Sequence, residues 1–166
     1  MGSPRSLTVL RDEVDARVSA MQNSHGDWPC AAGCDACCRR LGALPQVTAP
    51  EFASLWGAIE ALPDRDAVRE AIITARPDAA GHYTCPMLDR DAGRCRVYEA
   101  RPIACRTYGF YAGRDGDYWC DRVTQHLHAR RDTLVAGSQM GTDRRRDATL
   151  GPSLDLAELV ARTDSA

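Results

Sequence analysis

The chain contains no lysine, and each of its 21 basic side chains is an arginine, which we attribute to genome base composition. The formal net charge of −2 disfavours a nucleic-acid-binding protein, so no nucleic-acid partner is expected. No run of about 18 apolar residues occurs, which predicts no membrane span and no membrane partner. A basic segment followed by an apolar one is missing near the N-terminus, so we expect no secretory signal and a cytoplasmic location.

Sequence signatures of the common enzyme classes are also missing. The chain has no GxGxxG, no phosphate-binding loop, no GxSxG and no paired-carboxylate motif, so the sequence leaves open whether the protein is an enzyme, and its catalytic residues are unassigned. Cysteine, in contrast, is abundant, with eight residues in 166. Without an export signal, such cysteines are more often metal ligands or catalytic groups than disulfide partners.

Apolar periodicity predicts a mainly α (α+β) fold, a compact metal-organised domain with several helices and a short β-hairpin. A helix is expected in residues 1–21, and a capping box, Thr48 to Glu51, begins another that runs to about Leu62. Four further helical segments are expected: a helix after Pro63-Asp64, a helical turn around Cys105, a helix of roughly four turns after Cys120 and a short helix over residues 154–160. Residues 41–47 suggest a short strand, and the turn-rich residues 89–93 suggest the hairpin.

Three regions are expected along the chain. Residues 1–29 form an N-terminal helix and loop, residues 30–136 form a cysteine-rich metal-binding domain, and residues 137–166 form a linker and a short C-terminal helix. The linker is inferred from residues 137–152, which are rich in glycine and arginine.

Cys30, Cys34, Cys37 and Cys38 form a C-x3-C-x2-C-C cluster, which is the strongest functional signal in the sequence. Four further cysteines are dispersed, namely Cys85, Cys95, Cys105 and Cys120. Soft thiolates in sets of three or four suit zinc or iron–sulfur coordination, so all eight are candidate metal ligands. We expect the eight sulfurs to lie in one compact region. An iron–sulfur or polynuclear iron centre is the favoured occupant, and two zinc ions are the less favoured alternative.

The vicinal pair Cys37 and Cys38 raises the question of one centre or two. Adjacent side chains tend to diverge, so these two thiolates should not easily share one tetrahedral ion. Either two centres are present, or one multinuclear cluster is approached from two directions. Disulfides, inert buried thiols and the C-x3-C-x2-C triad of radical S-adenosylmethionine enzymes are less favoured alternatives, the last because no series of βα units accompanies the triad.

Arginines adjoin three of the cysteines, in Cys38-Arg39-Arg40, Arg94-Cys95-Arg96 and Cys105-Arg106, and Arg122 follows Cys120 by two residues. Such guanidinium groups could stabilise thiolates, although chance adjacency is a comparable explanation with 21 arginines. Arg101 and Arg106 could instead clamp an anionic cofactor or substrate carboxylate. His25 and His82 are possible substitutes for a thiolate ligand.

The cysteine pattern, with Cys85-Pro-Met-Leu, Cys95-Arg-Val-Tyr-Glu, Arg101-Pro and Cys105-Arg, resembles the YkgJ family of cysteine-rich proteins. The match runs from Cys30 to about Cys120. The resemblance implies a zinc- or iron-chelating domain with eight characteristic cysteines. A related motif occurs in flagellin lysine-N-methylases, which makes methyl transfer possible for relatives.

Three functions follow as hypotheses. The first is a metal-binding protein with an iron–sulfur or other iron centre, or zinc. The second is a small metal-dependent enzyme with methyl-transfer or redox chemistry on a peptide or small molecule. The third is a zinc-structured adaptor that binds a protein partner. Because zinc is colourless and iron–sulfur clusters are not, colour separates the metals.

Overall fold

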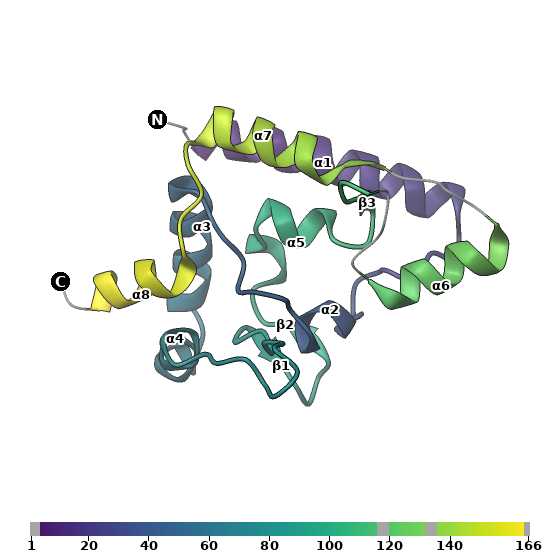
Figure 1. Cartoon of the computed structure of the whole chain (residues 1–166). Coiled ribbons are helices and arrows are strands. Elements are labelled where there is room, and N and C mark those ends of the chain that lie inside the picture. Colours follow the sequence, from purple (N-terminus) through teal and green to yellow (C-terminus); the bar gives the residue numbers. More distant parts are fainter. Residues whose placement is uncertain (1–3, 116–119, 132–135, 165–166) are drawn as a thin grey trace. The chain divides into compact units, whose positions relative to one another are not determined.

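The computed structural model describes residues 4–115, 120–131 and 136–164 (Figure 1). The described residues are mainly helical with short strands, as the sequence predicts. They divide into two compact units, each built from two separate stretches of the chain. Unit 1 comprises residues 1–34 and 103–151, and unit 2 comprises residues 35–102 and 152–166. None of the described helices is long and apolar enough to cross a membrane.

Unit 1 is built on the long helix α1 (Pro4–Ser24), which confirms the predicted N-terminal helix. Its other elements are α5 (Ile103–Thr107), β3 (Tyr111–Ala112), α6 (Asp121–Arg130), β4 (Gly137–Ser138) and α7 (Gln139–Leu150). Leu7, Leu10 and Val14 of α1 pack with Ile103 and Leu150. A second cluster contains Met21, Trp28, Phe110, Val123 and Leu127. Strands β3 and β4 pair in parallel.

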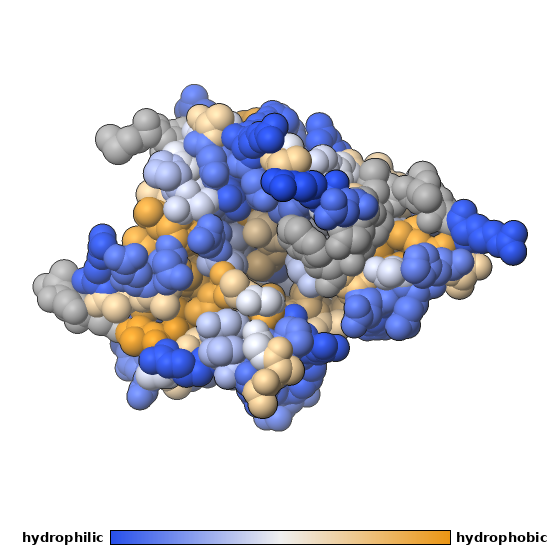
Figure 2. Space-filling view, in the orientation of Figure 1, coloured by the Kyte–Doolittle hydropathy of each residue, from blue (hydrophilic) through white to orange (hydrophobic). Residues whose placement is uncertain are grey.

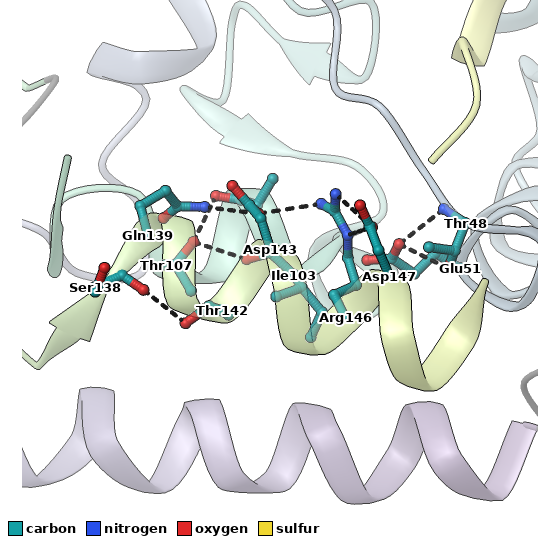
Figure 3. Close-up of polar contacts among 11 residues, drawn as sticks. Thr48, Glu51, Ile103, Thr107, Ser138, Gln139, Thr142, Asp143, Arg146 and Asp147 are labelled. Atoms are coloured by element: carbon teal, nitrogen blue, oxygen red, sulfur yellow. Dashed lines mark hydrogen bonds and ion pairs between the residues drawn. The ribbon is translucent and has the colours of Figure 1, made fainter. Parts of the chain in front are cut away.

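Helix α7 corrects the expectation that residues 137–152 are a linker without regular structure. Ser138 caps this helix by accepting a hydrogen bond from the Gly141 amide at 3.3 Å. Apolar periodicity does not predict this helix, because polar residues, Gln139, Thr142 and Arg146, occupy its buried positions. Figure 3 shows their local partners: Gln139 donates to Asp143 (3.2 Å), and Arg146 pairs with Asp143 (3.4 Å) and Asp147 (3.0 Å).

Unit 2 contains helices packed on one apolar core. Its elements are α2 (Ala36–Arg39), α3 (Ala49–Glu60), α4 (Arg65–Ile73), β1 (Leu88–Asp89), β2 (Arg94–Cys95), the 3-10 turn η1 (Tyr98–Ala100) and α8 (Leu156–Asp164). The core combines Leu55 and Ile59 of α3, Ile72 of α4 and Val160 of α8, all fully buried. Apolar surface (orange) is visible around α8 on the face drawn in Figure 2.

The capping box of α3 forms as the sequence predicts. Glu51 Oε2 accepts hydrogen bonds from the backbone amide and the hydroxyl of Thr48, each at 2.9 Å, and both residues are fully buried. The predicted strand at residues 41–47 is wrong. This stretch makes only single bridges at its two ends, Leu41 with Tyr83 and Val47 with Leu154, because its partners lie in separate parts of the chain.

The hairpin is confirmed but short, since β1 and β2 pair only through Leu88 with Cys95 and Asp89 with Arg94. Asp89 Oδ1 accepts from the amides of Asp91 (3.1 Å) and Ala92 (2.9 Å), and these bonds stabilise the turn. Helix α6 ends at Arg130, earlier than expected, where Arg131 adopts a left-handed conformation (φ 54°). Residues 132–135, which a helix of four turns after Cys120 would include, lie outside the described residues.

Candidate metal centre

Each unit contains four of the eight cysteines. Unit 1 holds Cys30, Cys34, Cys105 and Cys120, and unit 2 holds Cys37, Cys38, Cys85 and Cys95. The C-x3-C-x2-C-C cluster is therefore divided, with two of its cysteines in each unit. All eight are free thiols. Cys85 is buried, with 8% of its surface exposed, and the other seven are partly exposed.

Cys37 and Cys38 lie on the single-turn helix α2, and their Sγ atoms are 4.0 Å apart. Two thiolates on one tetrahedral zinc, with Zn–S bonds of about 2.3 Å, lie about 3.8 Å from each other. The expectation that these adjacent side chains diverge is therefore wrong here, and their sharing of one ion stays a prediction. Rotation about the two Cα–Cβ bonds brings the sulfurs of neighbouring helical residues together.

Cys85 joins this pair through both its backbone and its thiol. Its amide donates to the Cys38 carbonyl at 2.7 Å, and its thiol contributes to raising the pKa of the Cys38 thiol. Cys95 enters through β2, opposite Leu88 of β1, and interacts electrostatically with Cys37 and Cys38. The two clustered and two dispersed cysteines of unit 2 therefore gather in one place.

The thiols of this group hold their protons more tightly than free cysteine does. The hydrogen bond to Cys38, followed by burial, strongly raises the pKa of Cys37. The hydrogen bond from Cys37 lowers the pKa of Cys38, but the bond with Cys85 and burial outweigh it, and the pKa rises to about 12. Burial raises the pKa of Cys95. A bound cation would have to replace these protons, because metal ions are ligated by the thiolate form.

The thiols do not yet form a closed coordination site. Within residues 4–115, 120–131 and 136–164, no three Cys, His, Asp or Glu side chains converge closely enough to hold one ion. The donor chemistry of unit 2 nevertheless fits zinc or iron, since it offers four soft thiols and one sulfur pair at nearly the separation of shared ligands.

In unit 1, Cys30 and Cys120 pack against the same apolar cluster of Met21, Trp28 and Phe110. The Cys30 thiol donates to the Tyr108 carbonyl at 3.6 Å. Cys120 is the residue that precedes the first turn of α6, as the sequence predicts.

Gly109 is a site residue that sequence reasoning missed. A Cβ at this position would lie 3.1 Å from Cys30 Sγ, and its φ of +80° also favours glycine. Its carbonyl accepts a hydrogen bond from Trp28 Nε1 at 3.1 Å. The available signal is a glycine four residues after Cys105, but only the fold reveals that it allows close approach of Cys30.

Cys34 contacts Arg122, whose Nη1 donates to Cys34 Sγ at 3.3 Å. Arg122 lies in the first turn of α6, directly after Cys120 and Asp121. Cys105 lies on α5, three residues before Tyr108, whose carbonyl accepts from Cys30. The cysteines of unit 1 are therefore carried by α5, by the start of α6 and by the loop after α1.

Three of the six arginines beside cysteines in the sequence pair with carboxylates. Arg39 pairs with Asp35 at 2.6 Å, and Arg96 pairs with Asp64. The expectation that sequence neighbours act as thiolate partners is therefore wrong for these two residues, because their side chains reach acids on their own helix or on a neighbouring segment.

The two arginines expected to clamp an anion belong to different units. Arg101 stacks on Tyr98, with its guanidinium carbon 3.4 Å from the ring centroid, and its charge lowers the pKa of Cys95 in opposition to burial. Arg106 is buried and forms an ion pair with Asp15 of α1. These contacts describe structural roles, and the anion clamp stays a prediction.

The two histidines proposed as substitute ligands contact other groups. His25 Nδ1 lies 3.2 Å from the Met21 carbonyl, and its ring meets the edge of Trp28. His82 Nδ1 lies 4.0 Å from Asp78 Oδ1. His82 and Cys85 instead share the wall of an open cleft of about 620 Å³ in unit 2, which Arg76, Arg90 and Arg96 also line.

The described chain is thus a cysteine-rich protein with eight free thiols, four in each unit. The model of a family described as "CxxCxxCC: Putative zinc- or iron-chelating domain" matches residues 29–131. This match covers more than half of the chain, so the chain belongs to that family, and the resemblance to the YkgJ proteins is confirmed. No curated protein and no solved structure matches the chain.

Proposed function

We propose that this metal-binding protein holds an iron–sulfur or other polynuclear iron centre through its clustered and dispersed cysteines. The gathering of Cys37, Cys38, Cys85 and Cys95 in unit 2 is the observation that supports this proposal. Sets of four thiolates are the usual ligands of such clusters. Eight thiols exceed what one mononuclear site needs, which favours iron in several atoms over a single structural ion.

Arginine contacts support the same proposal. Iron–sulfur centres with four thiolates carry net negative charge, and donors to sulfur tune their reduction potential. Arg122 donates to Cys34, and Arg101 lies within electrostatic reach of Cys95. The bound centre would supply one-electron chemistry, while the chain would provide the ligands, their burial and these guanidinium groups. A reducing compartment, the cytoplasm, would keep all eight thiols available.

The experiment is anaerobic purification with measurement of iron, zinc and acid-labile sulfide per chain. We expect a brown protein that contains iron and sulfide, with visible absorption that bleaches on reduction. A Cys85→Ser variant should lose metal, and the neighbouring Thr84→Ser variant is the matched control that should keep it. Colourless protein with stoichiometric zinc would mean that the bound metal is zinc and not iron. Protein without either metal would contradict the proposal.

Catalysis at the centre is a second candidate function, because the cleft of about 620 Å³ reaches Cys85. A peptide or small-molecule substrate entering the cleft would lie beside a metal ligand, within range of Arg90 and His82. Ligand screening by thermal shift tests this candidate with the metal-loaded protein, using Arg90→Gln as the variant expected to abolish any hit. Hits that persist unchanged in this variant would place the substrate elsewhere.

A further inference from the structure

We propose that the eight cysteines form two separate four-thiolate metal centres, one within each unit. The inference rests on the proposed function, because it divides the ligands of the same metal-binding activity. It starts from the path of the chain. Each unit receives two cysteines of the C-x3-C-x2-C-C cluster and two dispersed ones, and the boundary falls between Cys34 and Asp35.

Unit 2 brings its four cysteines together by contacts that all lie within the unit. Cys37 and Cys38 present sulfurs 4.0 Å apart from one turn of α2. The hydrogen bond from the Cys85 amide to the Cys38 carbonyl, 2.7 Å, fixes Cys85 beside that turn. Cys38, Cys85 and Cys95 also pack against the same apolar core, so the fourth corner is supplied by the hairpin strand β2.

Unit 1 relates three of its cysteines, Cys30, Cys34 and Cys120, to the start of α6. Cys30 and Cys120 pack against one apolar cluster, and Arg122 in the first turn of α6 contacts Cys34. Cys105 approaches from α5, whose following residues Tyr108 and Gly109 contact Cys30. The close approach at Gly109 leaves Cys30 near the end of α5, the helix that carries Cys105.

The spacing within the cluster explains why it can serve two centres. Gly33, with φ +90°, turns the chain just before Cys34, and α2 starts at Ala36. Asp35, the residue before α2, pairs with Arg39 at the end of that helix at 2.6 Å. Cys34 therefore ends the loop of unit 1, whereas Cys37 and Cys38 belong to a helical turn of unit 2.

Paired substitutions test the division. Cys37→Ser/Cys38→Ser should remove the centre of unit 2, and Cys105→Ser/Cys120→Ser should remove that of unit 1. Each double variant should lose about half of the bound metal, and the combined quadruple variant should lose all of it. Ala31→Ser/Ala32→Ser, in exposed positions inside the same cluster, is the control and should keep the full metal content.

A second measurement on the unaltered protein avoids variants that fail to fold. Iodoacetamide labelling during stepwise chelation, followed by mass spectrometry, reports when each thiol becomes reactive. Cys37, Cys38, Cys85 and Cys95 should lose protection as one group, and the other four as another. Any other grouping, including all eight together, overturns two centres in favour of a shared one. Protein that binds no metal contradicts the proposed function itself, which is a distinct outcome.

Discussion

Arginines show that sequence adjacency is a poor guide to contact with sulfur. Arg39 follows Cys38 directly but pairs with Asp35, whereas Arg122, 88 residues from Cys34, donates to its thiol. A guanidinium reaches several ångströms from its backbone, so its partner depends on which segments the fold brings near. The sequence left arginine support and chance adjacency as comparable explanations, and it could not identify which arginine contacts a thiol.

Arg122 and Arg39 therefore form a matched pair for mutagenesis. Arg122→Gln removes the charge-assisted hydrogen bond to Cys34 and should weaken metal binding by about 10-fold, the lower end of effects seen when partners of metal ligands are removed. Arg39→Gln should leave the affinity unchanged, since Arg39 pairs with a carboxylate. Competition with a chromophoric chelator measures both. Equal affinities for the two variants would show that the contact with Cys34 has no role in binding.

Protonation of the thiols in unit 2 predicts how the metal-free protein responds to alkali. The folded chain raises the pKa of Cys38 from 9.0 to about 12, so the unfolded chain releases this proton first as pH rises. The stability contributed by the neutral thiol is complete below pH 9.0 and is lost between pH 9.0 and about 12. Urea unfolding of chelated, reduced protein at several pH values should show this decline, and Cys38→Ala should make it shallower.

At the scale of elements, local signals predicted α3 well. Thr48 and Glu51 are three residues apart in sequence, so the capping box needs no distant partner to form. Helix α7 was missed because Gln139 and Arg146 are buried while polar, and their positions depend on packing in unit 1. Binary patterning detects helices with an apolar inner face, and it fails when the inner face is polar.

The capping box gives a stability prediction. Thr48→Ala removes the hydroxyl that donates to buried Glu51, and it should lower the free energy of unfolding by about 2 kcal/mol. The control is Thr163→Ala, an exposed position near the end of α8 whose hydroxyl bonds only to the Leu159 carbonyl. Chemical denaturation of the metal-loaded protein measures both variants. A Thr48 effect no larger than that of Thr163 would contradict the role of the box.

At the scale of the whole molecule, regular structure is unevenly distributed. Residues 82–102 hold only two-residue strands and one 3-10 turn, although Met87, Leu88 and Val97 anchor them to the core of unit 2. In contrast, α3, α4 and α8 share a core of fully buried side chains. Metal binding can contribute folding free energy where secondary structure is sparse.

Metal removal should therefore lower the melting temperature and loosen residues 82–102 before the helices of unit 2. Hydrogen exchange with and without chelator should show lost amide protection in this segment and retained protection in α3 and α4. The quadruple variant without Cys37, Cys38, Cys105 and Cys120 is the control, since chelator should change it little. An unchanged melting temperature for stripped wild-type protein would mean that the metal does not support the fold.

The interleaved path of the chain also sets the order in which the protein can mature during synthesis. Cys30 and Cys34 leave the ribosome long before Cys105 and Cys120, and the cysteines of unit 2 emerge in between. Unit 2 then waits for α8, whose Leu156 and Val160 complete its core, until after α7 has completed unit 1. The nascent chain therefore carries its first thiols through most of its translation, and the full set of eight is complete only once Cys120 has been made.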